Sequence, residues 1–101
     1  MAIWTRELDL KALNAGSANT AISHLGIEFT EYGDDYVRAR IHVDERTCQP
    51  YGILHGGVSV VLAETLGSMA AACSIPEGYR CVGLGVTASH VRAGRKGSWI
   101  T

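Results

Sequence analysis

The stretch that decides the fold is Gln49-Pro50-Tyr51-Gly52-Ile53-Leu54-His55-Gly56-Gly57, with Ala63-Glu64-Thr65 and Gly67-Ser68 shortly after it. An apolar run without proline begins at the glycine pair and predicts a helix over residues 56–73. Apolar residues occupy nearly every face of this helix, which predicts that a sheet wraps around it. The charge of Glu64 and the many small residues of the run favour a buried helix over a membrane span.

Two short helical segments are predicted ahead of this helix. Residues 7–15 have amphipathic spacing, with Asp9 as a cap and Gly16 as a stop. Residues 19–25 are predicted to add a further helical turn, which ends at Gly26.

Strands are predicted on both sides of the long helix. Residues 27–30 predict one strand, and residues 36–43 alternate apolar with polar side chains as a half-buried strand does. Because Gly33-Asp34-Asp35 between them is a turn signal, the two strands are predicted to form a hairpin. After the helix, residues 81–92 again alternate and predict a long strand, and a further strand is predicted to begin near Ser98.

Composition predicts a single cytoplasmic domain over residues 1–101. Nine basic and ten acidic residues are well mixed and give a net charge of −1, so no field for nucleic acid or a membrane surface is present. Cys48, Cys73 and Cys81 are odd in number and lack zinc-ligand spacing, which favours free thiols in a reducing compartment. The four histidines have no metal-ligand spacing either, so no metal is predicted.

The chemistry suggested by the residues centres on Glu64 and on the glycine pair. A lone carboxylate among apolar neighbours is unfavourable without a partner, which points to a catalytic group, although a structural ion pair is the plainer alternative. The first amides of the helix at Gly56-Gly57 have no internal acceptor and suit a developing oxyanion, but a tight turn would also need glycines. Ser68 lies one helical turn beyond Glu64 and could hydrogen-bond to it.

Spacing separates these two groups. Gly56 and Glu64 are eight residues apart, which is about 12 Å along a helix axis. One helix therefore cannot bring both groups to one carbonyl. Two antiparallel helices in a dimer could do so, which predicts an active site shared between subunits.

The quoted stretches closely resemble the hotdog-fold thioesterases of the phenylacetate and 4-hydroxybenzoyl-CoA type. The nearest patterns are those of bacterial enzymes that act on 1,4-dihydroxy-2-naphthoyl-CoA in menaquinone synthesis and of proofreading thioesterases in enterobactin synthesis. The resemblance runs from Trp4 to the end of the chain. It implies an α+β hotdog fold and hydrolysis of an acyl-CoA or acyl-carrier-protein thioester, with a hydroxybenzoyl or dihydroxynaphthoyl acyl group and no cofactor beyond the coenzyme A of the substrate.

The resemblance also implies the roles of the catalytic residues. Glu64 would be the nucleophile or general base, and the Gly56 amide would polarise the thioester carbonyl with help from Gln49 and His55. Ser68 would assist the attacking water or the intermediate. The family assembles as dimers or homotetramers, with each active site at a subunit interface.

Substrate-binding residues follow from the same resemblance. Val82 and Gly83 would hold the pantetheine arm through their backbone, and His90 and Arg92 would lie near the coenzyme A nucleotide. This chain departs from the family in residues 84–90, where three polar positions have changed. The family also continues past Thr101 with strands in the middle of its sheet, so we expect an incomplete sheet in these 101 residues and a longer natural protein.

Two other functions fit the same residues. A hotdog dehydratase would act on a carrier-bound hydroxyacyl chain, although the spacing of His-Gly-Gly and Glu64 is typical of thioesterases. A non-catalytic module would bind acyl-CoA without turnover. Thiol release separates the first from a thioesterase, and insensitivity of binding to the loss of the Glu64 charge would support the second.

Overall fold

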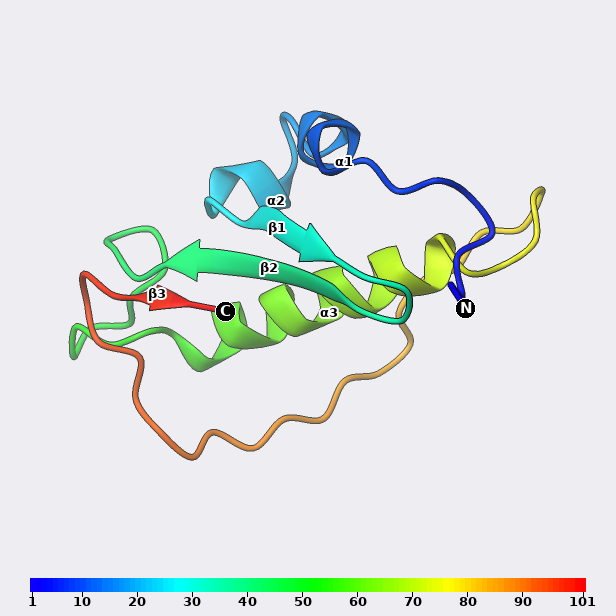
Figure 1. Ribbon diagram of the computed structural model, residues 1–101. Coiled ribbons are helices and arrows are strands. Elements are labelled where there is room, and N and C mark those ends of the chain that lie inside the picture. Colours follow the sequence, from blue (N-terminus) through cyan, green and yellow to red (C-terminus); the bar gives the residue numbers. More distant parts are fainter.

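The computed structural model describes residues 1–101 and has an α+β architecture (Figure 1). In chain order the elements are α1 (Leu10–Gly16), α2 (Ala21–His24), β1 (Glu28–Tyr32), β2 (Val37–His42), α3 (Gly56–Ala72) and β3 (Trp99–Ile100). The strands form an antiparallel sheet in the order β1-β2-β3, and α3 packs against β2. The predicted helices, hairpin and final strand are therefore confirmed, and Asp9 caps α1 as expected.

Strand β2 is the central strand of the sheet, and it forms a hairpin with the edge strand β1. Glu28 pairs with Arg40 and Tyr32 with Val37, with an irregularity in register after Phe29. On the free side of β1, the Asn14 amide takes the place of a neighbouring strand. Its Oδ1 accepts from the Phe29 amide at 2.8 Å, and its Nδ2 donates to the Phe29 carbonyl at 3.0 Å. The backbone N–H and carbonyl of the buried Phe29 are therefore satisfied at the edge of the sheet, although no strand pairs with β1 on this side.

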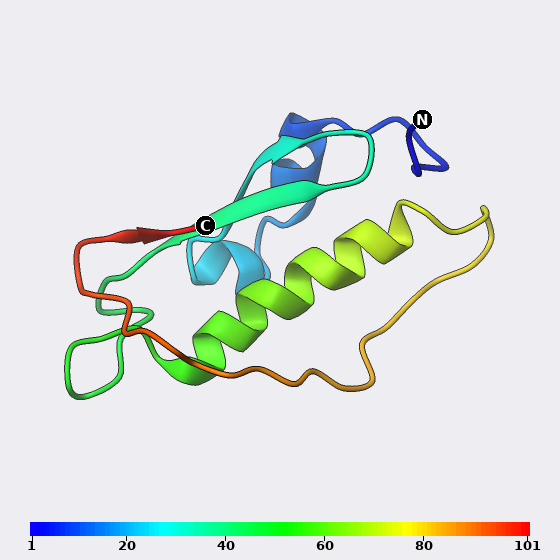
Figure 2. The same cartoon turned by 60° about the horizontal axis from the view of Figure 1, so that its bottom comes forward.

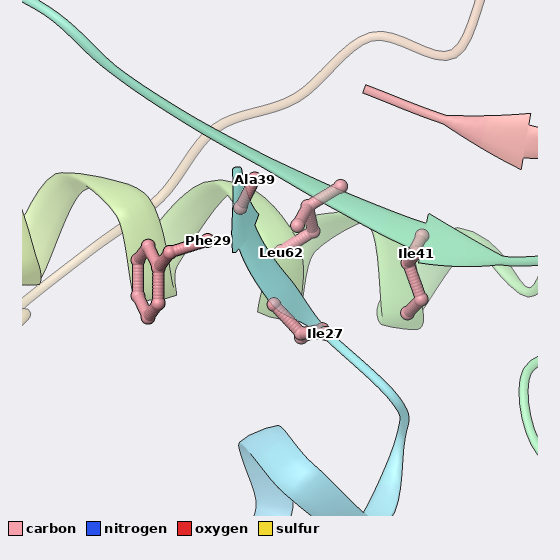
Figure 3. Close-up of a cluster of buried hydrophobic side chains, with 5 residues drawn as sticks. All are labelled: Ile27, Phe29, Ala39, Ile41 and Leu62. Carbon is pink, nitrogen blue, oxygen red and sulfur yellow. The ribbon is translucent and has the colours of Figure 1, made fainter. Parts of the chain in front are cut away.

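The hydrophobic core joins the hairpin to α3 (Figure 3). Its buried members are Ile27, Phe29, Ala39, Ile41 and Leu62. Ile27, directly before β1, alternates with Phe29, and Ala39 alternates with Ile41 in β2, so the intervening side chains face outward. This is the half-buried pattern that the sequence predicted for the hairpin.

Helix α3 is covered by the sheet on one face only. Leu62 and Thr65 are its only buried residues, and the hairpin lies on one side of it while residues 79–94 pass along the other (Figure 2). The prediction that a sheet wraps around the helix is not met by the three strands of these residues. None of the three helices has both the length and the apolar character that a membrane span requires.

The strand predicted over residues 81–92 is wrong for this structure. The segment runs alongside α3 without strand pairing, and Val82, Leu84 and Val91 are largely exposed. Alternation describes which side chains could share a face, whereas a strand also needs a neighbouring edge for its backbone hydrogen bonds. Because α3 separates the segment from the hairpin, no such edge lies beside it (Figure 2).

We predict that Ile41→Ala lowers the free energy of unfolding by about 3 kcal/mol, because it removes a side chain that is fully buried between the hairpin and α3. Urea unfolding measures the change. The control is Ile3→Ala, since Ile3 is 52% exposed and its truncation should change stability by no more than about 0.5 kcal/mol. Equal effects in the two variants would contradict this account of the core.

Candidate active site

A buried threonine holds the loop that carries the first site residues. The Thr47 hydroxyl donates to the His42 carbonyl at 2.9 Å and accepts from the Asp44 amide at 3.0 Å. The Thr47 carbonyl accepts from the His55 amide at 2.8 Å, which closes the loop just before α3. The two ends of the loop over residues 48–54 are therefore held together by the hydrogen bond between Thr47 and His55.

An ion pair braces the same region. The Arg46 guanidinium donates through Nε to Asp44 Oδ1 at 3.1 Å and through Nη2 to Oδ2 at 2.7 Å. These hydrogen bonds hold the pKa of the Asp44 carboxyl well below its usual range. Nη1 of Arg46 also reaches the His24 carbonyl at 3.4 Å, so the pair connects the loop to the end of α2.

Hydrogen bonds orient Gln49 and His55. Gln49 Oε1 accepts from the Tyr51 amide, which leaves its NH₂ group free to donate. His55 is the N-cap of α3, and its Nδ1 accepts from the Gly57 amide at 2.9 Å. A neutral ring that accepts at Nδ1 carries its proton on Nε2, so His55 also presents a donor.

The amide of Gly56 is the free donor at the start of α3. It is the first helical residue, and no backbone or side-chain acceptor meets its N–H. The positive end of the helix dipole adds to its attraction for negative charge. Gly56 lines a cavity of about 940 Å³, along with Gln49, Ser59, His90 and Arg92.

Glu64 lies at a different place along α3. Its side chain is half-buried, and Ser68 donates to Oε1 at 2.7 Å. None of the ion pairs in the structure includes Glu64, so the structural ion pair considered above is absent. Gly83 covers the carboxylate closely, since a Cβ at Gly83 would lie 2.5 Å from Oε1.

The predicted site residues fall into two groups. Gln49, Gly56, His90 and Arg92 line the larger cavity. Glu64, Ser68, Val82 and Gly83 line a second cavity of about 260 Å³. His55 lines neither and caps the helix beside the first group. The predicted residues thus line cavities at two places on α3, in agreement with the separation calculated from the sequence.

Other residues near these groups were not singled out from the sequence. Thr47 anchors the loop, and Ser59 contacts both Gly56 and His90. The sequence feature that could have indicated Ser59 is its position three residues after Gly56. A serine hydroxyl at that spacing in a helix can donate to the backbone carbonyl three residues before it. The free thiol of Cys81 donates to the Ser68 carbonyl at 3.4 Å and so borders the Glu64 cavity. No group of three His, Cys, Asp or Glu side chains that could hold a metal ion occurs.

Comparisons with known proteins agree on one family. Residues 51–101 match the model of the thioesterase superfamily. The proofreading thioesterase EntH of Cronobacter turicensis is 53% identical over 95 residues, which cover 94% of this chain and 69% of that protein. A crystal structure of a thioesterase from Haemophilus influenzae has a TM-score of 0.92 at 46% identity, over 96% of this chain and 67% of the other. A mutant thioesterase from Pseudomonas aeruginosa has a TM-score of 0.93 at 44% identity, over 97% and 70%.

We predict that Asp44→Asn destabilises the fold at neutral pH and that the difference from wild type shrinks in acid. Because folding lowers the pKa of Asp44, its contribution is complete above the unfolded pKa of about 4 and is lost as the pH falls below that value. Urea unfolding at about pH 7 and about pH 3 tests this. The control is Asp35→Asn in the exposed hairpin turn, where no ion pair is present. A pH-independent difference for Asp44→Asn would contradict the prediction.

Proposed function

Because this chain belongs to the thioesterase superfamily and is a thioester hydrolase, we propose that Glu64 promotes hydrolysis of an aromatic acyl-coenzyme A thioester. The helix packed on an antiparallel sheet has the hotdog fold of its solved relatives. The observation that carries the proposal is the state of Glu64, a carboxylate that faces a cavity and has no cation beside it. Ser68 holds one of its oxygens and leaves the other available.

Two routes use this carboxylate. As a general base, Glu64 takes a proton from water while the water oxygen attacks the thioester carbon, and the thiolate leaves with its sulfur–carbon electron pair. As a nucleophile, Glu64 attacks the carbonyl itself and expels the thiolate, and water then hydrolyses the resulting anhydride. Both routes yield a free acid and a thiol. In H₂¹⁸O, ¹⁸O in the Glu64 carboxylate would establish the anhydride route with water attack at the Glu64 carbon, because the general-base route places ¹⁸O only in the product acid.

The donors around Gly56 complement the carboxylate. In either route, negative charge develops on the carbonyl oxygen, and a free amide at a helix start stabilises such charge. Gln49, whose NH₂ group is free to donate, lines the same cavity as Gly56, and His55 with its Nε2–H directly precedes Gly56 in the chain. We therefore assign Gly56 as the oxyanion donor, supported by Gln49 and His55.

The two half-sites call for a second subunit. Gly56 and Glu64 line different cavities of one chain, and about 12 Å of helix separates them. We propose that two antiparallel α3 helices bring Gly56 of one protomer to Glu64 of its partner. A dimer is then the smallest active unit, and a homotetramer would contain two such pairs.

The cationic side chains suit a phosphorylated thiol carrier. Arg92 and Arg95 line the larger cavity with His90, and neither arginine forms an ion pair. We propose that this cavity takes the nucleotide of coenzyme A and that the backbone of Val82 and Gly83 contacts the pantetheine arm. A relative reported above carries the name of a proofreading thioesterase, whereas a role in menaquinone synthesis stays a prediction.

We predict that Glu64→Gln lowers kcat for thiol release about a hundredfold or more, the scale expected when a positioned acid–base group is lost. The panel should contain 4-hydroxybenzoyl-CoA, 1,4-dihydroxy-2-naphthoyl-CoA and aliphatic acyl-CoAs. Glu77→Gln is the control, since Glu77 lies in the exposed turn after α3.

The aromatic thioesters should have the highest kcat/KM, and faster turnover of aliphatic ones would contradict the proposed acyl group. Equal rates for wild type and Glu64→Gln would remove Glu64 as the catalytic carboxylate. Binding without turnover in both proteins would support the non-catalytic module instead.

We predict that Gly83→Ala lowers kcat about tenfold or more, because its Cβ would overlap Glu64 Oε1 and displace the carboxylate. Gly85→Ala is the matched control two residues away, where an added Cβ meets nothing within 4 Å. Steady-state kinetics on 4-hydroxybenzoyl-CoA measures both. Similar losses in the two variants would mean that stiffening of the segment, and not the contact with Glu64, causes the effect.

A further inference from the structure

Ser59 and His90 form a three-atom contact with the Gly56 carbonyl. Ser59 Oγ lies 2.7 Å from the Gly56 oxygen and 2.6 Å from His90 Nε2. His90 Nε2 lies 3.2 Å from the same carbonyl oxygen. The His90 ring also packs on Gly56, since a Cβ there would lie 3.2 Å from Cε1. A serine at the end of the first turn of α3 and a histidine from residues 81–92 therefore meet at one peptide group.

Donor and acceptor rules fix the protons of this contact. The Gly56 carbonyl can only accept, so the two hydrogens must come from the Ser59 hydroxyl and the His90 ring. If Ser59 donates to the carbonyl and His90 donates from Nε2 to Ser59, every short contact contains a hydrogen. If Ser59 instead donates to an unprotonated Nε2, the carbonyl oxygen faces two lone pairs. The first arrangement is the satisfied one.

This arrangement excludes a serine nucleophile at the site. A nucleophilic serine gives its proton to a histidine that accepts at the facing nitrogen. Ser59 donates its hydrogen to the Gly56 carbonyl, so the satisfied arrangement requires Nε2 of His90 to be the donor toward Ser59 Oγ. The pair therefore holds a peptide in place and does not act as a base and nucleophile.

The peptide that the pair holds adjoins the free amide. The Gly56–Gly57 peptide is fixed at its carbonyl by Ser59 and His90, and at its N–H by His55 Nδ1. Glycine has the widest backbone freedom of any residue, so Gly56 needs such restraints to keep its own N–H in one direction. Fixed donors stabilise developing charge better than mobile ones, because they need no reorganisation during the reaction.

We propose that Ser59 is a positioning residue, which together with His90 fixes the Gly56 amide as an oxyanion donor and fastens residues 81–92 to the start of α3. The expected effect of this contact on kcat rests on the proposed thioester hydrolysis. The contact geometry itself does not depend on that function. Near the other end of the segment, Gly83 lies close against the Glu64 carboxylate. The same segment therefore lies beside both half-sites of the proposed active site.

The kinetic test compares Ser59→Ala with wild type on 4-hydroxybenzoyl-CoA. We expect kcat to fall about tenfold, the scale of one lost hydrogen bond, while KM changes less than about twofold, because the oxyanion forms only in the transition state. Ser59→Thr keeps the hydroxyl and should recover most of the rate. Ser74→Ala is the matched control, because Ser74 Oγ makes the same bond three residues back, to the Ala71 carbonyl, at the far end of α3.

A double-mutant cycle tests the partnership. His90→Ala should reduce kcat as Ser59→Ala does, and the double variant should be no more than about twofold slower than either, since the two residues act on one peptide. Additive losses would show that Ser59 and His90 act separately and would overturn the proposal. So would an unchanged kcat in Ser59→Ala, or a raised KM with kcat intact.

A readout without substrate separates this inference from the proposed function. ¹⁵N NMR of the histidine rings, with His90 assigned through His90→Gln, should show the Nε2–H tautomer in wild type and a tautomer mixture in Ser59→Ala. An Nδ1–H tautomer in wild type would overturn the inference even in an active enzyme. If wild type hydrolyses no thioester, the proposed function fails, and the NMR result still decides whether the contact exists.

Discussion

The packing of α3 against the β1–β2 hairpin is the interaction on which the rest of the structure depends. Leu62 of the helix belongs to one buried cluster with residues of the hairpin, among which Ile41 is fully buried. Both half-sites lie on this helix, and the loop that leads into it is anchored at Thr47 beside the end of β2. Burial of apolar surface at one face of α3 therefore sets the position of every group that the chemistry uses.

The length of a helix then imposes the division of the site. A rigid helix keeps Gly56 and Glu64 about 12 Å apart, and no rotation of side chains removes that distance. The same rigidity fixes each group with respect to its own neighbours, Ser68 for the carboxylate and His55 for the first turn. Helix α3 of a second protomer is the simplest means of bringing the Gly56 amide and a Glu64 carboxylate to one substrate. Dimerisation is therefore part of the proposed mechanism.

The hydrogen bonds at the proposed site leave several donors and one carboxylate oxygen without a partner in the protein. Gln49 engages its oxygen and keeps its NH₂ group, and His55 engages Nδ1 and keeps Nε2–H. The Gly56 amide has no acceptor, and Glu64 has a hydrogen bond to one oxygen without a cation. The free donors belong to Gly56, to the N-cap His55 before it and to Gln49 in the same cavity as Gly56, and the free acceptor lies two turns along α3. That distribution of charge suits a reaction in which a carbonyl oxygen gains negative charge while water or the carboxylate attacks.

By itself, the sequence determined the elements whose signals are local. Alternation over residues 36–43, the turn at residues 33–35 and the apolar run before Pro76 predicted the hairpin and α3, because side-chain period and turn chemistry depend on near neighbours. The motif around Gly56 and Glu64 pointed to residues that line the two cavities of the proposed site. Only the tertiary structure decided that residues 81–92 pair with no strand, that Glu64 has no cation, and that Ser59 meets His90 across 31 positions of sequence. Each of these features depends on which segments distant in the sequence lie next to each other in space. The pattern of residues along the chain does not specify those neighbours.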